Sequence, residues 1–296
     1  MTNITLKQLR YFEALARKGH FGRAAESCAI SQPAMSVQIK ELETELGTPL
    51  FERTAREVRL TSFGEDFAGR VRSILQSVDD LSDIARAARE GTMARLRLGV
   101  IPTIAPYLLP KLIGALTRAH PGLDVHVRET LTAKLVEELF AGRLDAAIVA
   151  LPISDPGLTE VALFDESLVL VRPQKDAGTP VPSRSDLAQM RLLLLEEGHC
   201  FRDQALSFCN MPSAVPREGL DSSALSTLVQ MVGAGLGVTL IPEMAVSVET
   251  GSAAVCTDRL DGPQPTRTVG MIWRRTNPLA DQLDGISRIV GAAAEL

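Results

Sequence analysis

The sequence lacks the features that mark secreted, membrane and disulfide-bonded proteins. Its 296 residues contain only four cysteines, too few for a disulfide framework, which predicts a reducing compartment, the cytoplasm. No run of about 18 apolar residues occurs, so we expect no membrane span. The first residues also lack the basic and then apolar pattern of a signal peptide, which argues against a secreted solute-binding protein. Any disulfide in this chain is therefore expected to be transient.

Signatures of enzymes and of metal sites are missing as well. The four histidines have no metal-ligand spacing with the cysteines, and no Ser-His-Asp set or carboxylate pair can be argued from spacing. The glycine-rich stretch 233–237 follows an expected helix and precedes an expected strand, the reverse of a dinucleotide-binding fingerprint, and it lacks the Lys-Ser/Thr of a P-loop. We interpret it as a helix cap and turn, and we expect no enzyme, no cofactor and no metal site.

Charge is divided unevenly along the chain. The net charge of −5 by itself argues against a nucleic-acid partner. Residues 1–61, however, hold nine Lys and Arg against seven Glu, a net charge of +2, while the remaining 235 residues carry −7. This asymmetry permits a DNA-binding head on an acidic body.

Residues 4–61 are expected to form a small helical domain. Apolar residues at 6, 9, 12, 15 and 16 have helical spacing, and Gly19 follows where a helix-ending glycine is common. A second helix is expected at about 22–28 and a third at about 33–46, with Ser31 as N-cap and Pro33 in the first turn. This order indicates a helix-turn-helix, in which the later helix enters the major groove of DNA.

Segment 52–61 alternates basic and apolar residues, which suits a β wing after the third helix. Arg53 and Arg56 are placed to reach DNA phosphates. A generic helical mini-domain with solvated charges has a similar pattern, and the pattern alone leaves both interpretations open.

Short motifs in this head point to one family. The head is similar, without a gap, to the winged helix-turn-helix of LysR-type transcriptional regulators, in Phe21-x-x-Ala24-Ala25, Ser31-Gln32-Pro33-Ala34-Met35-Ser36, Ile39, Leu42-Glu43, Leu46-Gly47, Leu50-Phe51-x-Arg53 and Leu60-Thr61-x-x-Gly64. The resemblance implies that Ser31, Gln32, Pro33, Ser36 and Lys40 lie at the DNA groove.

Residues 62–92 are expected to form one long helix that pairs with a second copy. Apolar residues recur at alternating spacings of four and three, the pattern of a coiled coil rather than of a face packed on its own domain: Phe67, Val71, Ile74, Val78, Leu81, Ala85 and Ala88. A dimer places two heads on two half-sites of operator DNA. The LysR-type resemblance implies the same pairing of linker helices, and we expect a homo-oligomer, a dimer of dimers.

Residues 93–296 are expected to form a two-lobed α/β body. Strands are expected at 95–101, 123–127, 146–150, 168–171, 192–195, 238–241 and 268–273, and helices at about 105–119 and 278–294. Helical patterns separate several strands, which predicts a parallel sheet. The chain is expected to leave the first lobe (93–165 and 268–296) for the second (166–267) and to return near 268. This double crossing resembles the type 2 periplasmic-binding-protein fold of the regulatory half of LysR-type proteins.

Two cysteines lie nine positions apart in a segment that is expected to be helical from 201 to 208. Helical geometry puts the Cα atoms of Cys200 and Cys209 roughly 13 Å apart, whereas a disulfide needs less than about 7 Å. Cys200 has His199 before it, Arg202 within a turn and a position at the helix start, all of which favour the reactive thiolate. The pair therefore indicates either a redox switch that needs unwinding or two buried cysteines on an ordinary helix.

Longer motifs resemble the hydrogen peroxide sensors of the LysR family. They are Gly198-His199-Cys200-Phe201-Arg202-Asp203-Gln204-Ala205 with Phe208-Cys209, and Ile101-Pro102-Thr103-Ile104-x-Pro106-Tyr107-Leu108-Leu109-Pro110. The resemblance implies that Cys200 is the peroxidatic cysteine and Cys209 its disulfide partner. It also implies a peroxide pocket formed by Thr103, Thr132, His199, Arg202, Asp203 and Arg267. Residues 223–227 and 210–220 depart from the family pattern, which puts the detail of the pocket in question.

The hypothesis that these features favour is a peroxide-sensing transcriptional activator of oxidative-stress genes. Its expected partners are double-stranded DNA, hydrogen peroxide, further copies of the chain and RNA polymerase. The alternative is a LysR-type regulator that responds to a small-molecule inducer in the cleft between the lobes. A thiol peroxidase is disfavoured, because the head and the coiled coil would then have no purpose.

Overall fold

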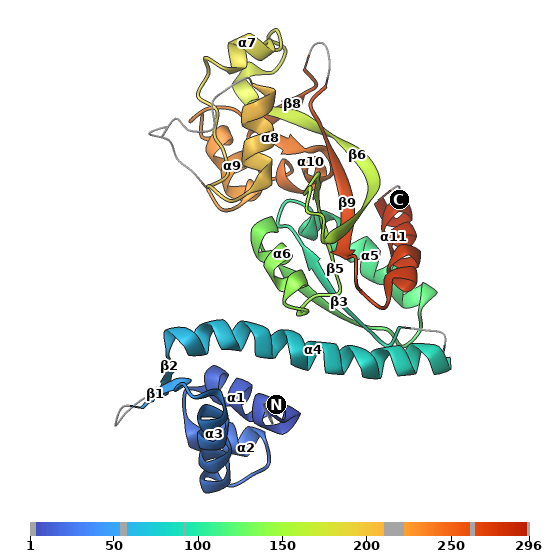
Figure 1. The fold of residues 1–296 in the computed structure, drawn as a ribbon. Helices are drawn as coiled ribbons and strands as arrows, with labels where there is room; N and C mark the ends of the chain where they lie inside the picture. Colours follow the sequence, from blue (N-terminus) through green and yellow to red (C-terminus); the bar gives the residue numbers. More distant parts are fainter. Residues whose placement is uncertain (1–3, 54–57, 91–92, 210–221, 261–263, 295–296) are drawn as a thin grey trace. The chain divides into compact units, whose positions relative to one another are not determined.

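The computed structural model in Figure 1 describes residues 4–53, 58–90, 93–209, 222–260 and 264–294. The chain divides into two compact units. The first contains Met1–Ala85 and the short segment Phe140–Arg143, and the second contains Arg86–Leu139 and Leu144–Leu296.

Three helices form the core of the first unit: α1 (Leu6–Lys18), α2 (Phe21–Ser27) and α3 (Gln32–Leu46). Gly19 ends α1 in the left-handed conformation, at φ 60°, as expected from its position. Ser31 caps α3 by accepting the Ala34 N–H at 3.3 Å, so the predicted start of this helix is confirmed. The largest fully buried side chains of this core come from α1, α3 and the segment after α3: Phe12, Leu15, Met35, Ile39, Leu42 and Leu50.

A short two-stranded sheet follows α3, in the place where a wing was expected. β1 (Phe51–Arg53) pairs antiparallel with β2 (Val58–Leu60). The carboxylate of Glu43 in α3 anchors its start by accepting the N–H groups of Leu50 and Phe51 at 2.9 and 3.2 Å. Arg56 lies outside the described residues, and so does the side chain of Arg53.

Helix α4 (Ser62–Glu90) has 29 residues and corresponds to the predicted linker helix. The first apolar side chains of α4 pack in the core of the first unit. Val71 is buried in the same core as Phe12, and the ring centroid of Phe67 lies 5.1 Å from that of Phe12. This part of the helix therefore packs on its own domain, contrary to the expectation for the whole repeat. Farther along, the side chains of Ile74 and Leu81 are 46% and 64% exposed. Ala85 and Ala88 have side chains outside the described residues.

The second unit is built on a seven-stranded sheet in the order β4-β3-β5-β9-β6-β7, with β8 pairing with β6. The strands are β3 (Arg95–Val100), β4 (Asp124–Glu129), β5 (Ala146–Leu151), β6 (Leu158–Pro173), β7 (Thr239–Pro242), β8 (Val255–Asp258) and β9 (Thr266–Arg274). Strand β3 is parallel to β4 and β5, but β9 runs antiparallel to both β5 and β6. The expected parallel sheet is therefore wrong in part, because the chain returns along β6 and β9 as a long antiparallel pair (Figure 1).

Two separate hydrophobic cores give this unit its two lobes. Helices α5 (Ala105–Ala119), α6 (Thr132–Phe140) and α11 (Ala280–Ala294) contribute to the first core, with the start of β6 and most of β9. Helices α8 (Cys200–Phe208), α9 (Leu225–Gly233) and α10 (Glu243–Glu249) contribute to the second, with the end of β6 and the short helix α7 (Arg184–Leu187). Strand β6 thus passes from one core to the other, from Leu158 to Leu168 and beyond.

Two local expectations had different outcomes. Residues 192–195 make only isolated bridges, Leu192 to Val238 and Leu195 to Ser222, so the expected strand there is wrong. Helix α9 ends at Gly233 and Gly235 has φ 79°, which confirms that the glycine-rich stretch is a helix end and turn. No helix among the described residues is long and apolar enough to cross a membrane.

Candidate thiol site and nucleic-acid interface

Helix α8 carries a cysteine at each end. Cys200 is its first residue and Cys209 its C-cap, and neither is in a disulfide bond. The predicted helix is confirmed, so its rise of 1.5 Å per residue separates the two Cα atoms by about 13 Å. A disulfide between them requires part of α8 to unwind.

The two thiols also pack against different hydrophobic cores, although both lie on α8. Cys200 is partly buried and packs against the first core, whereas Cys209 is 1% exposed and belongs to the second core. Joining them therefore takes at least one sulfur away from the core against which it packs.

Cys200 faces a small cavity. The space open to the centre of a water-sized sphere is about 10 Å³, enough for about one water-sized molecule. Its lining combines the start of α8 with two segments of the first lobe: Ile101, Pro102, Thr103, Leu131, Thr132, Gly198, His199, Cys200 and Phe201. Within the described part of the chain, the hydroxyl oxygen of Thr132 is buried and has no hydrogen-bond partner. The Cys200 thiol and the Thr132 hydroxyl, which has no hydrogen-bond partner among the residues that the structure describes, thus line the same small cavity.

A buried arginine holds the second hydroxyl of this cavity. Arg267 on β9 donates from Nη1 to Thr103 Oγ1 at 2.8 Å and from Nη2 to the Thr103 carbonyl at 3.0 Å. Its Nε donates to Glu166 Oε2 at 2.7 Å. Because a guanidinium can only donate, the Thr103 hydroxyl accepts this bond and keeps its own proton available.

His199 supplies a neutral ring to the cavity wall. The preceding Gly198 has φ 95°, a conformation that favours glycine, and it turns the chain into the start of α8. Burial lowers the pKa of His199, and Glu196, with Oε1 4.0 Å from Nε2, raises it by a smaller amount. The imidazole is therefore uncharged at neutral pH and can both donate and accept a hydrogen bond.

The other two residues of the expected pocket lie elsewhere. Arg202 is buried and donates from Nη1 to the Leu195 carbonyl at 2.9 Å. Asp203 is exposed and lines a different hollow of about 450 Å³, together with Arg184 and Phe208. Of the expected pocket residues, those that line the cavity beside Cys200 are Thr103, Thr132 and His199. Arg267 does not line the cavity but hydrogen-bonds to Thr103, which does. Arg202 and Asp203 do not line it.

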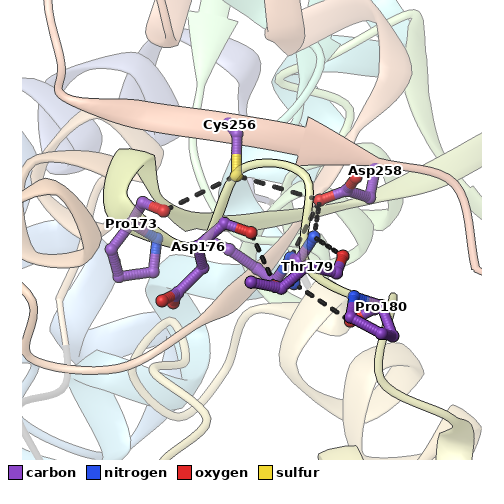
Figure 2. A network of polar contacts seen from close by, with 7 residues as sticks. Pro173, Asp176, Thr179, Pro180, Cys256 and Asp258 are labelled. Atoms are coloured by element: carbon purple, nitrogen blue, oxygen red, sulfur yellow. Dashed lines mark hydrogen bonds and ion pairs between the residues drawn. The ribbon is translucent and has the colours of Figure 1, made fainter.

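A third thiol of the second unit, Cys256 on β8, lies in a polar network of its own (Figure 2). Its Sγ lies 3.5 Å from the Pro173 carbonyl and 3.9 Å from Asp258 Oδ2. Asp258 in turn accepts from Arg172 Nε at 2.8 Å. Burial raises the pKa of Cys256, and the charge of Asp258 raises it further. This environment disfavours the reactive thiolate.

A larger cleft lies between the lobes and shares His199 and Thr103 with the small cavity. It measures about 130 Å³ and is lined from both lobes, for example by Pro106 and Leu225. Tyr107 donates to Glu249 Oε1 across it at 2.7 Å, and burial followed by this bond raises the pKa of Tyr107 well above its usual range. The sequence motif contained Tyr107, but no sequence signal indicated Glu249 or Glu166.

The exposed face of α3 carries most of the residues expected at DNA. Ser31, Gln32, Pro33 and Lys40 are exposed and Ser36 is half-buried. The opposite face, with Met35, Ile39 and Leu42, is fully buried in the core of the head. A solvent-facing helix start of this kind suits a major groove.

A helix-turn-helix with a wing, followed by a two-lobed α/β unit, defines the class of the protein as a DNA-binding regulator with a sensory domain. Residues 6–65 match the family "Bacterial regulatory helix-turn-helix protein, lysR family", and residues 89–291 match "LysR substrate binding domain". The chain belongs to the LysR family.

Relatives and solved structures similar to this chain have names that refer to hydrogen peroxide or to OxyR. A "Probable hydrogen peroxide-inducible genes activator" of Streptomyces viridosporus is 44% identical over 91% of this chain and 88% of the relative. The "DNA-binding transcriptional dual regulator OxyR" of Escherichia coli K12 is 38% identical over 98% and 95%. Among solved structures, a full-length OxyR variant from Pseudomonas aeruginosa has a TM-score of 0.78 and 36% identity, covering 98% of this chain and 95% of that one. A Corynebacterium glutamicum OxyR variant with hydrogen peroxide bound has a TM-score of 0.66 and 33% identity, over 98% and 92%.

Proposed function

We propose that this chain is a transcriptional regulator, not an enzyme, that senses hydrogen peroxide through Cys200. The observation that carries the proposal is the cavity of about 10 Å³ in which the Cys200 thiol meets the unpartnered hydroxyl of Thr132. A cavity of this size suits a very small polar molecule. The names of the relatives, hydrogen peroxide-inducible genes activators, support the same signal.

The chemistry follows from the groups in the cavity. The thiolate of Cys200 donates an electron pair to one peroxide oxygen, an S–O bond forms, and the O–O bond breaks. The departing oxygen takes the bonding pair and a proton and leaves as water, so Cys200 becomes a sulfenic acid. Hydroxyl donors such as Thr103 and Thr132 stabilise the charge on the departing oxygen.

A second step makes the signal reversible and structural. The Cys209 thiolate attacks the sulfur of the sulfenic acid, a disulfide forms, and hydroxide leaves and is protonated to water. Because the two cysteines stand at opposite ends of α8 and in different cores, this bond unwinds the helix and repacks both lobes. A thiol reductant restores the starting state.

The proposed assembly has domains at 4–61, 62–92 and 93–296, with lobes at 93–165 plus 268–296 and at 166–267. The head binds operator DNA through Ser31, Gln32, Pro33, Ser36 and Lys40, with Arg53 and Arg56 of the wing on phosphates. The exposed Ile74 and Leu81 of α4 pair with a second copy, and two such dimers associate. Repacking of the lobes then changes the spacing of the heads and the contact with RNA polymerase in the cytoplasm.

A second candidate function is a response to a small-molecule inducer. The observation that favours it is the cleft of about 130 Å³ between the lobes, which carries two carboxylates, Glu129 and Glu249. In that case peroxide leaves promoter output unchanged, and the cysteines are incidental.

The test is disulfide mapping by mass spectrometry before and after substoichiometric peroxide, with promoter output followed in parallel. We expect a Cys200–Cys209 linked peptide, and loss of both the link and the response in Cys200→Ser and Cys209→Ala proteins. Cys256→Ser is the matched control and keeps both. A Cys200→Ser protein that still switches with peroxide would overturn the proposal.

A further inference from the structure

A buried carboxylate behind the cavity has no role in the chemistry described above. Glu166 on β6 is 6% exposed, and both of its oxygens are occupied. Oε2 accepts from Arg267 Nε at 2.7 Å, and Oε1 accepts from the backbone N–H of Met244, in the first turn of α10, at 2.9 Å. Glu166 does not line the cavity and reaches it only through Arg267.

The bond to Glu166 fixes the plane of the Arg267 guanidinium. This group is a rigid planar fork, so anchoring Nε determines where Nη1 and Nη2 point. They meet the hydroxyl and the carbonyl of the same residue, Thr103. The guanidinium also lies over the ring of Phe201, 5.6 Å from its centroid, which limits its remaining freedom. All of these groups are at least nine-tenths buried, so water cannot replace a lost partner easily.

We propose that Glu166 is a positioning residue for the reaction of Cys200 with peroxide. It holds Arg267 so that the Thr103 hydroxyl accepts from the guanidinium and turns its own proton toward the cavity. That proton is donated as a hydrogen bond to the peroxide oxygen that departs when the thiolate sulfur bonds to the other oxygen. Charge stabilisation of this kind depends on a donor that is held in place before the reaction. The inference rests on the proposed function and adds one residue to its machinery.

A glutamine at position 166 is the informative substitution. Glu166→Gln keeps the shape and one acceptor oxygen, which Arg267 and Met244 must now share, so the guanidinium loses its fixed plane. Asp165→Asn is the matched control, because Asp165 is the neighbouring carboxylate on the same strand. It is exposed and accepts from Thr268 Oγ1 at 2.6 Å.

The experiment compares two reactions of Cys200 in the full-length protein. One is oxidation by hydrogen peroxide, and the other is alkylation by iodoacetamide, which displaces iodide from carbon and needs no donor for a departing oxygen. In Glu166→Gln we expect the second-order rate constant for peroxide to fall by about tenfold, a smaller loss than removal of a direct donor brings. The alkylation rate constant stays within about twofold, and Asp165→Asn changes neither.

A double-mutant cycle tests whether Glu166 acts through Thr103. Thr103→Val removes the hydroxyl at constant shape, and in that background Glu166→Gln is expected to bring no further loss of peroxide rate. If Glu166→Gln does not fold, as judged by circular dichroism, Glu166→Asp replaces it, since it keeps the charge and withdraws the carboxylate from Arg267.

Three results would overturn the inference: an unchanged peroxide rate, equal falls in both rates, or losses that add in the double variant. Failure of the proposed function has a different signature, because it shows in the wild-type protein. There, Cys200 would react with peroxide no faster than free cysteine does.

Discussion

Cys200 and Cys209 stand at the two ends of the nine-residue helix α8 and pack against different hydrophobic cores, one in each lobe. The thiol that faces the cavity is half-buried, and its partner is 1% exposed. Reduced α8 is therefore held at both ends by packing, and the proposed disulfide would work against that packing.

Truncation of the buried partner is expected to destabilise the reduced protein. Cys209→Ala leaves a small cavity in the second core and should lower the free energy of unfolding by about 1–2 kcal/mol. Cys200→Ala should cost less, because Cys200 is half-buried. Urea denaturation under reducing conditions measures both values, and equal losses would contradict the difference in burial.

Alkylation of Cys256 is expected to need a higher pH than that of an ordinary thiol. Burial and the Asp258 carboxylate raise its pKa, and the thiolate is the form that reacts, so its labelling begins at a pH above the usual range for cysteine. Iodoacetamide labelling followed by peptide mass spectrometry gives the pH profile of this thiol. In urea-unfolded protein the profile should return to the ordinary one; an unshifted profile in the folded protein would contradict the network in Figure 2.

Acid is expected to weaken the fold through His199. Its pKa is lowered by burial, so the unfolded chain takes up a proton at a higher pH than the folded one. The contribution of the neutral His199 ring to the free energy of unfolding is fully present above the ordinary histidine pKa of about 6.5. It is lost as the pH falls from there through the folded-state pKa. Denaturation curves between neutral and mildly acidic pH measure this loss. A His199→Gln protein with the same pH slope would count against the assignment.

DNA binding is expected to depend on salt and on Lys40. Lys40→Ala at the exposed face of α3 should weaken operator binding, and it should reduce the slope of log affinity against log salt by about 0.9 if the lysine neutralises one phosphate. Fluorescence anisotropy over a salt series gives the slope. Lys111→Ala, an exposed lysine on α5, removes the same charge from the regulatory unit and should leave the slope unchanged.

Self-association is expected to depend on the exposed apolar side chains of α4. Leu81→Asp places a charge on a side chain that is 64% exposed, so the monomer fold should survive while pairing of α4 is lost. Analytical ultracentrifugation measures the change. Arg72→Glu, an exposed residue on the same helix, is the control, and dissociation in both variants would point to a general charge effect instead.

Local sequence chemistry determined the helices and their ends. Ser31 and Pro33 mark the start of α3, Gly19 and Gly47 end α1 and α3 in the left-handed conformation, and the segment after His199 is helical as expected. These features depend on capping and on backbone conformation within a few residues, so a single sequence contains them. The motifs around Thr103 and Cys200 likewise pointed to one site, and the fold brings both to one cavity.

Contacts between distant segments were decided only by the tertiary structure. The antiparallel course of β9 between β5 and β6, the separation of Cys200 and Cys209 into two cores, and the position of Glu166 behind Arg267 join residues that are far apart in the chain. The sequence around a glutamate on a strand does not indicate which side chain its carboxylate will contact once it is buried. Its partner is set by the register of β6 and β9, in which Glu166 lies opposite Arg267, and that register arises only when the two lobes fold around these strands.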